Sequence, residues 1–334
     1  MNPAVLAPAA AFACALALIA LMLRFRWHWA VDLPNHRSLH TDPTPRSGGV
    51  GILVGLVVAS VIAQDAQGGA PLQAVGLALV LGVLSLMDDR GGLPIKARLS
   101  AHLLAAGAFI AWLAEAVPPH GAPWWWLAIA LLAIAAMTNF YNFMDGANGL
   151  AGGMAVIGFG CYGIASAAEN PGFAAICFSI SAAGAAFLCF NLNGRIFMGD
   201  GGSVPLGFLA AALGLEGMRR GYWPGWFGPL AFAPFVADAL VTLVRRILRR
   251  ERFWQAHRDH YYQRLVRSGW SHPRLAAAEF TLMTACAVAA LVARTAAPLP
   301  RAAAFATISV LLGGAAFAVD RRWRLHQARP AIQQ

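Results

Sequence analysis

Long apolar runs separated by short polar stretches dominate this chain. A helix that crosses a bilayer needs about 20 predominantly apolar residues, and eleven segments approach that length. They are 4–23, 48–64, 71–87, 99–114, 124–144, 149–168, 172–192, 201–218, 225–247, 274–293 and 298–319. The pattern therefore predicts an all-α, polytopic integral membrane protein with about eleven transmembrane helices.

Positive charge follows the first apolar run and does not precede it. Arg24, Arg26 and His28 come directly after Ala4–Leu23. This order is typical of a retained first helix whose N-terminus lies outside, so we expect a periplasmic N-terminus and a cytoplasmic C-terminus. The cytoplasmic loops would then cover about 24–47, 88–98, 145–148, 193–200, 245–273 and 320–334. They hold 20 of the 25 Lys and Arg residues, Arg274 follows the fifth loop directly, and four lie on the other side.

The composition agrees with a membrane protein. The 334 residues are 59% hydrophobic and 12% charged, whereas soluble domains are about a quarter charged, so an ordinary soluble enzyme is excluded. The net charge of +10 favours anionic lipid head groups and phosphate-bearing substrates, because the apolar background argues against nucleic acid. We find no long linker and no inverted repeat, and we expect one domain over residues 1–334.

A polar, glycine-rich break interrupts the apolar pattern at residues 139–153, NFYNFMDGANGLAGG. Asp145 is its carboxylate, and Asn142 and Asn148 flank it. An ionisable group at membrane depth is costly and therefore marks a functional site by default. We expect the rest of the chain to supply partners for Asp145.

Two adjacent carboxylates, Asp88 and Asp89, end the third apolar run. They repel unless a cation or a proton lies between them, and Mg²⁺ often binds through one or two carboxylates plus substrate phosphates. Lys96 and Arg98 follow at a spacing that suits a diphosphate. For an isolated pair of this kind, a polar helix end facing water remains the simpler interpretation.

Glycines accompany two further charged residues. Asp200 lies in GDGGS, where glycines let the backbone approach a phosphate closely. Arg46 lies in PRSGG, just before an expected helix start whose N–H groups would bind anions. Alone, each could be an ordinary loop. Together they put a third carboxylate and another cation on the expected cytoplasmic side.

The expected loop 245–273 is the most basic. Its first arginines fit a head-group anchor, whereas His257, Arg258 and His260 favour an anionic nucleotide or phosphate. Two histidines without further Cys or His nearby make a weak zinc site. The GxGxxG pattern at 158–163 has no surrounding βαβ unit, so we interpret it as a helix-packing face.

Five motifs in this order, PRSGG, the DD pair, NFYNFMDGANGLAGG, RIFMGDGGS and AHRDHYYQRL, carry a resemblance. The chain resembles the polyprenyl-phosphate N-acetylhexosamine-1-phosphate transferases, glycosyl transferase family 4, and within them the branch that starts O-antigen or related surface-glycan chains. The resemblance implies an enzyme of the bacterial inner membrane that uses Mg²⁺, with Mn²⁺ as the alternative. It implies transfer of a sugar 1-phosphate from a UDP-N-acetylated sugar to undecaprenyl phosphate at the cytoplasmic face, with release of UMP.

The same resemblance assigns roles. Asp88, Asp89 and Asp145 would be catalytic, and Asp200 would bind the metal ion. The substrate-binding residues would be Arg46, Lys96, Arg98, Asn142, Asn148, Asn191, His257, Arg258 and His260. Asn148 stands where the family often has a second acid, and either Asn191 or Asn193 takes the family's asparagine position.

Several alternatives stay open. The sugar is N-acetylglucosamine or a rarer amino-deoxy sugar such as N-acetylfucosamine. AHRDHYYQRL lacks the three-histidine run of the peptidoglycan-precursor enzymes, which disfavours UDP-MurNAc-pentapeptide. A transporter of an anionic solute would need buried charges at mid-membrane depth, and a non-catalytic scaffold would be free to lose the carboxylates. A homodimer and a monomer are both compatible with the sequence.

Overall fold

Every expected transmembrane segment is helical in the computed structural model, which describes residues 2–27, 30–32, 43–64, 66, 69, 71–116, 124–252 and 257–328. The first half contains α1 (Pro3–Arg24), α2 (Gly48–Ala63), α3 (Leu72–Gly91), α4 (Ile95–Ala116), α5 (Trp124–Phe143), α6 (Leu150–Met154), the π-helix η1 (Ala155–Phe159) and α7 (Gly160–Ser166). The second half contains α8 (Pro171–Asn191), α9 (Asp200–Arg219), α10 (Phe227–Ala231), α11 (Ala233–Leu248), α12 (Tyr261–Arg267), α13 (His272–Thr295) and α14 (Pro298–Ala328).

Eight of the described helices are long and apolar enough to cross a membrane, namely α1, α3, α4, α5, α8, α9, α13 and α14. Two shorter apolar helical segments, α2 and the run Leu150–Ser166, lie among them. The chain is therefore an all-α, multi-pass membrane protein, as the hydrophobic pattern predicts. The total of eleven crossings remains a prediction.

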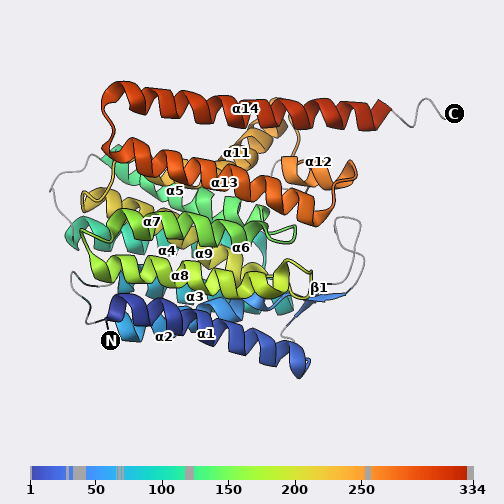
Figure 1. Ribbon diagram of the computed structural model, residues 1–334. Coiled ribbons are helices and arrows are strands. Elements are labelled where there is room, and N and C mark those ends of the chain that lie inside the picture. Colours follow the sequence, from blue (N-terminus) through green and yellow to red (C-terminus); the bar gives the residue numbers. More distant parts are fainter. Residues whose placement is uncertain are drawn as a thin grey trace.

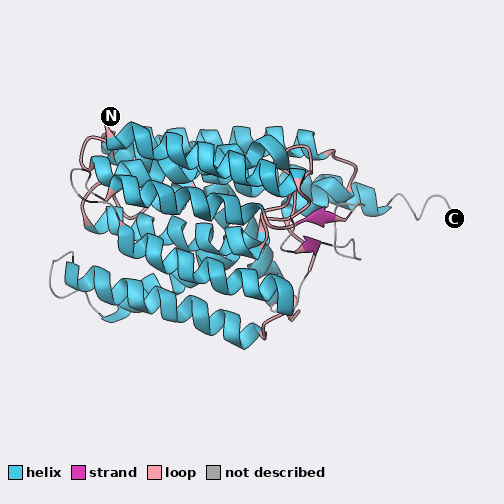
Figure 2. Ribbon diagram, turned by 90° about the horizontal axis from the view of Figure 1, so that it is seen from below, coloured by secondary structure: helices cyan, strands magenta, loops and turns pink. Residues whose placement is uncertain are grey.

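The long helices lie side by side in a bundle, with α1 and α2 at one edge and α14 at the other (Figure 1). The N-terminus lies at one end of the bundle, and the described chain leaves α14 at the opposite end (Figures 1 and 2). Helix α9 packs against both α3 and α5 and is the most buried of the long helices. Because α9 begins at Asp200, that carboxylate lies at one end of the bundle, on its most buried long helix.

Local chemistry explains where the expected boundaries are wrong. Helix α3 continues through Asp88 and Asp89 to Gly91, and Gly92 ends it at a φ of +68°, a conformation that glycine adopts without strain. Helix α4 already begins at Ile95. The expected loop 88–98 is therefore mostly helical.

The expected helix 225–247 is divided at Phe232 into α10 and α11. Pro234 lies in the first turn of α11, where its missing N–H costs nothing, whereas in the interior of one continuous helix it would remove a backbone hydrogen bond. Two features within the expected loops were not predicted. They are the helix α12 and the antiparallel pair β1 (Val31–Asp32) and β2 (Thr44–Pro45).

Glycines allow close helix contacts. A Cβ on Gly158 would meet the Phe232 ring, and one on Gly163 would meet the Phe178 ring, each within 2.6 Å. This confirms the packing interpretation of the GxGxxG pattern. In α2, a Cβ on Gly49 would come within 2.4 Å of the Gly202 backbone in α9.

Replacing Gly49 with alanine is therefore expected to destabilise the fold by about 1–3 kcal/mol, because backbone atoms, unlike a side-chain end, cannot move aside easily. The thermal unfolding midpoint of detergent-purified protein measures this. The matched control is Gly76→Ala in α3, where a Cβ would have no atom within 4 Å and where helix propensity favours alanine. Equal midpoints for the two variants would contradict the close contact.

Candidate active site

The PRSGG segment lies directly against the segment that precedes Asp200. The Phe197 N–H donates to the Pro45 carbonyl oxygen at 2.7 Å. In return, the N–H groups of Gly48 and Gly49 donate to the carbonyl oxygens of Phe197 and Met198, each at 2.9 Å. These backbone bonds fix Arg46 beside the start of α9, although about 150 residues separate the two segments.

The first turn of α9 binds two carboxylates through backbone N–H groups. The Gly199 N–H donates to Asp145 Oδ2 at 3.2 Å, and the Gly201 N–H donates to Asp89 Oδ2 at 3.3 Å. Gly199 has a φ of +75°, and a Cβ there would lie 2.6 Å from the Arg46 carbonyl oxygen. Unpaired N–H groups at a helix start favour anions, so this turn gathers acids from α3 and from the loop after α5.

Two arginines connect the acids. Arg46 Nη2 lies 2.8 Å from Asp89 Oδ1 and 3.0 Å from Asp200 Oδ1. Arg98 Nη1 lies 3.1 Å from Asp88 Oδ2 and 3.6 Å from Asp200 Oδ2. Asp200 is thus shared between the two guanidinium groups, and its side chain is 19% exposed, against 1% for Asp89.

Asp88 and Asp89 point toward different partners. Successive residues of a helix point about 100° apart. Asp88 therefore turns to Arg98 and to the Leu93 N–H, whereas Asp89 turns to Arg46 and the Gly201 N–H. Each member of the pair has its own arginine.

Asn142 belongs to the same cluster. Its Oδ1 accepts a hydrogen bond from Ser203 Oγ at 2.6 Å, and its side chain also hydrogen-bonds to Asp200. Ser203 was not among the predicted site residues. Its sequence signal is its place one turn after Asp200 on α9, where i and i+3 side chains share a face.

The electrostatics of this acid cluster (Asp88, Asp89, Asp145 and Asp200) favour a bound cation. Burial and then the negative charge of Asp200 raise the pKa of Asp145 to about 7. Carboxylate and amide oxygens are the ligands that Mg²⁺ prefers, so the donor set fits this ion. As arranged here, no group of three or more His, Cys, Asp or Glu in the described residues is ready to hold a metal ion, and Arg46 lies between Asp89 and Asp200.

Asn191 connects two loops beneath the acid cluster. Its Oδ1 accepts from the Gly149 N–H at 2.7 Å, and its Nδ2 donates to the Ile196 carbonyl oxygen at 2.8 Å. The residue is 4% exposed, so its amide is already used by the backbone, whereas Asn193 is exposed. Asn191 therefore positions the loops that carry Asp145 and Asp200.

Two predicted substrate-binding residues lie away from the acid cluster. The Asn148 N–H donates to His272 Nδ1 at 3.4 Å, and the Asn148 amide lies against Gly194. Lys96 is exposed on the first turn of α4 and has no ion pair within the described parts of the chain. Neither side chain touches the four carboxylates in this conformation.

The histidine motif approaches the acid cluster through α12. The Tyr262 hydroxyl donates to the Phe143 carbonyl oxygen at 3.0 Å, two residues before Asp145, and the His260 ring lies 5.8 Å from the Phe143 ring. The His257 ring lies 4.9 Å from the His260 ring, and burial lowers the His257 pKa to about 4. The Arg258 carbonyl oxygen accepts from Arg267.

A buried carboxylate outside the predicted set of site residues holds this motif. Asp238 Oδ1 lies 3.1 Å from His260 Nδ1 and accepts the Tyr261 N–H at 3.0 Å, while Oδ2 accepts the Tyr262 N–H at 3.2 Å. The available signal was its position as the only acid within the expected segment 225–247. Asp238 thus joins α11 to the start of α12.

The chain is similar to known proteins along most of its length. The sequence model of glycosyl transferase family 4 matches residues 72–218, which include all four acids of the cluster. The probable undecaprenyl-phosphate N-acetylglucosaminyl 1-phosphate transferase of Bacillus subtilis is 29% identical over 258 residues, covering 73% of this chain and 71% of that protein.

Two further relatives carry different names. The phospho-N-acetylmuramoyl-pentapeptide-transferase of Chloroflexus aggregans is 29% identical, covering 70% of this chain and 72% of its own length. The decaprenyl-phosphate N-acetylglucosaminephosphotransferase of Mycobacterium tuberculosis is 28% identical, and the match covers 74% of this chain and 71% of that protein. The motifs, their convergence in space and these matches agree: the chain is similar to glycosyl transferase family 4 over residues 72–218 and to transferases named above along about 70% of its length.

Proposed function

We propose that this chain transfers an N-acetylhexosamine 1-phosphate from a UDP-sugar to a polyprenyl phosphate, releasing UMP. The observation that carries the proposal is the meeting of Asp89, Asp145 and Asp200 with Arg46 and Arg98 at one end of the bundle. Transfer between two anionic phosphates depends mainly on positioning and charge neutralisation. This cluster supplies carboxylates and positively charged guanidinium groups for those tasks.

The arginines would bind phosphate oxygens, and the carboxylates would have other roles. Arg46 and Arg98 both contact Asp200, and either guanidinium can exchange that carboxylate for phosphate oxygens. Asp88 or Asp89 would orient or deprotonate the acceptor phosphate. Asp145 and Asn142 would line the nucleotide side, and His257, Arg258 and His260 would contact the donor from α12 and the loop before it.

Mg²⁺ would be held by Asp200, with Asp89 and Asp145 close by. When bound, the ion would neutralise the diphosphate and polarise the phosphorus under attack. The buried, excess negative charge that raises the Asp145 pKa supports a divalent cation at this place. The residues of the chain bind and orient the two phosphates around it.

An apolar cavity offers space for the lipid acceptor. A cavity of about 380 Å³ lies between α5, α9 and α10, and Phe140 lines it, two residues before Asn142. Its walls are almost entirely apolar, with Met137, Leu215 and Phe232 among them. A polyprenyl chain there would have its phosphate near the acid cluster.

We place the acid cluster on the cytoplasmic side of the bacterial inner membrane, with eleven crossings and a periplasmic N-terminus. The bias of Lys and Arg toward the expected cytoplasmic loops supports this orientation. The two ends of the described chain lie at opposite ends of the bundle, which supports an odd number of crossings (Figure 1). Both UDP-sugars and anionic lipid phosphates are accessible from that side.

The proposal includes undecaprenyl phosphate as the acceptor and O-antigen or another surface polysaccharide as the product. The motif AHRDHYYQRL supports this branch, whereas one relative is named as an N-acetylmuramoyl-pentapeptide-transferase. UDP-N-acetylglucosamine, a UDP-N-acetylfucosamine-like donor and UDP-MurNAc-pentapeptide are therefore the three donors to compare.

The test uses the full-length protein in membranes or detergent with undecaprenyl phosphate, Mg²⁺ and each donor in turn. We expect UMP release that requires both the lipid and the metal ion, and a lipid-linked sugar diphosphate of the corresponding mass. Omission of the lipid and addition of a chelator are the controls. If none of the three donors yields UMP while thermal unfolding shows folded protein, the proposed activity is wrong.

A further inference from the structure

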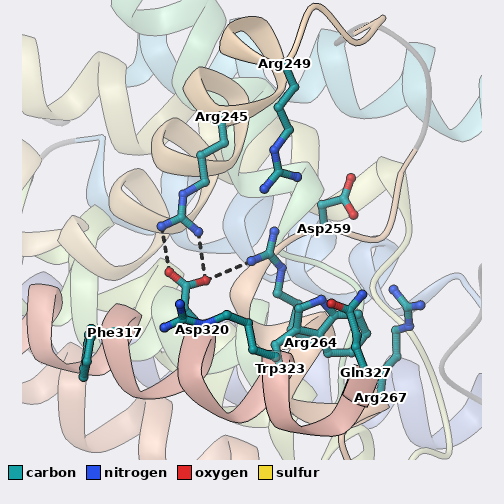
Figure 3. Close-up of a pocket in the computed structure, with 10 residues that line it drawn as sticks. Arg245, Arg249, Asp259, Arg264, Arg267, Phe317, Asp320, Trp323 and Gln327 are labelled. Carbon is teal, nitrogen blue, oxygen red and sulfur yellow. Dashed lines mark hydrogen bonds and ion pairs between the residues drawn. The ribbon is translucent and has the colours of Figure 1, made fainter. Parts of the chain in front are cut away.

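A polar cavity lies at the same end of the bundle as the acid cluster but shares none of its residues. Its volume is about 620 Å³, and α11, α12 and α14 line it together with Asp259 (Figure 3). Arginines supply most of its polar lining, namely Arg245, Arg249, Arg264, Arg267 and Arg324. This basic cavity has no part in the proposed transfer reaction.

The two acids of the basic cavity are already neutralised. Asp320 accepts two hydrogen bonds from Arg245, at 2.9 and 2.7 Å, and one from Arg264 at 3.0 Å (Figure 3). Asp259 forms an ion pair with Arg246, which lies outside the cavity. Neither carboxylate is left to balance the remaining arginines.

Three guanidinium groups therefore keep uncompensated charge. Arg249 comes only within 3.9 Å of Glu251, which pairs more closely with Arg246 at 2.8 Å. Arg324 is exposed and has no ion pair with any residue that the structure describes. Arg267 donates to a backbone oxygen and lies 4.7 Å over the Trp323 ring. An anion with several oxygens would satisfy all three.

The surroundings point to an anion at a membrane surface. Asp320 is the first charged residue after the long apolar run of α14, and this helix is the least buried of the long helices. Phe317 lines the cavity one turn before Asp320 and is 64% exposed. Trp323 lies one turn after Asp320, where tryptophan prefers the boundary between hydrocarbon and water.

We infer that the basic cavity binds the phosphodiester head group of an anionic glycerophospholipid. The phosphate oxygens would contact Arg249, Arg267 and Arg324, and an acyl chain would descend along Phe317 and the outward face of α14. Basic pockets between membrane helices bind anionic lipid head groups by the same combination of charge and depth. Free phosphate shares the charge but gains nothing from Phe317.

The cavity is connected to the histidine motif through α12. The Tyr261 ring lies between Arg245 and Arg264, whose guanidinium carbons are 5.3 and 5.5 Å from its centre. The neighbouring residues His260 and Tyr262 are tied to Asp238 and to the Phe143 carbonyl oxygen. A bound lipid would therefore hold α12 against the loop that carries Asp145.

Native mass spectrometry of the detergent-purified full chain, titrated with phosphatidylglycerol, tests the site. We expect one phosphatidylglycerol to bind at least tenfold more tightly than phosphatidylcholine. The double variant Arg249→Gln, Arg324→Gln should lose about tenfold or more of that affinity, since two guanidinium groups would lose their contact with the head-group phosphate. Both side chains are exposed, so the unfolding midpoint should not change.

The matched control is Arg321→Gln, because Arg321 is exposed on the same helix and does not line the cavity. If Arg321→Gln lowers the affinity for phosphatidylglycerol as much as the double variant does, general surface charge explains the binding and the proposal is overturned. Unchanged binding by the double variant, or equal binding of the two lipids, would overturn it as well. So would displacement of phosphatidylglycerol by a similar concentration of soluble glycerol phosphate. Binding is measured without turnover, so its outcome is independent of the proposed transferase activity.

Discussion

Asp200→Asn is expected to lower kcat by about 10³-fold or more, because it removes the carboxylate that both arginines share and that we propose holds Mg²⁺. A loss of this size corresponds to about 4 kcal/mol of barrier. The fold should survive, since Arg46 keeps Asp89 and Arg98 keeps Asp88 as partners. The measurement is UMP release at saturating donor and lipid.

The control for this substitution is Glu169→Gln, an exposed acid between α7 and α8, at the opposite end of α8 from Asn191. Its turnover should equal that of the unmodified protein. The unfolding midpoint of Asp200→Asn should stay close to normal, which separates lost catalysis from lost folding. A turnover within tenfold of the unmodified protein would remove Asp200 from the proposed metal site.

Arg46→Gln is expected to destabilise the protein by about 3–5 kcal/mol, the usual cost of removing one partner from a buried ion pair. Asp89, whose side chain is 1% exposed, would be left with the Gly201 N–H as its remaining hydrogen-bond donor. Arg46→Lys should recover part of the loss, because a single ammonium keeps the charge but not the planar guanidinium geometry. Thermal unfolding in detergent measures both variants.

Arg195→Gln is the matched control, because Arg195 is an exposed arginine in the segment that leads to Asp200 and contacts the Phe190 ring. Its removal should cost little. If Arg46→Gln unfolds at the same temperature as Arg195→Gln, the ion pairs of Arg46 contribute nothing to folding. Turnover should fall with Arg46→Gln in either case if this guanidinium also binds a phosphate.

The helices could be predicted from the sequence because apolar length is a local property. The run 298–319 predicts the start of α14 at Pro298, and 172–192 differs from α8 by one residue at each end. The predicted helix boundaries are wrong where tertiary contacts or the backbone conformation of single residues determine where a helix ends. The continuation of α3 through Asp88 and Asp89 depends on Gly92 and on the arginines that neutralise these acids.

The sequence predicts which four acids lie on one side of the membrane, but it does not predict which residues each of them contacts. The expected topology placed Asp88, Asp89, Asp145 and Asp200 on one side of the membrane, and the structure confirms that they lie together. Which arginine meets which acid depends on the backbone pairing of Pro45–Gly49 with Phe197–Met198, and no local pattern reveals a contact over such a distance. The hydrogen bond between Asp238 and His260 could not be predicted for the same reason, since it joins residues that are distant in sequence.

The position of Arg46 bears on where the smallest working unit of this protein begins. The region that matches the family model starts at residue 72, yet a guanidinium that neutralises two of its acids comes from residue 46, and α12 lies beyond the region's end at residue 218. A fragment cut to the matched region would contain every acid of the cluster and lack one of its two counter-ions. The match to the family model therefore contains the four acids and Arg98, whereas the charge balance of the site extends the functional unit toward both ends of the chain.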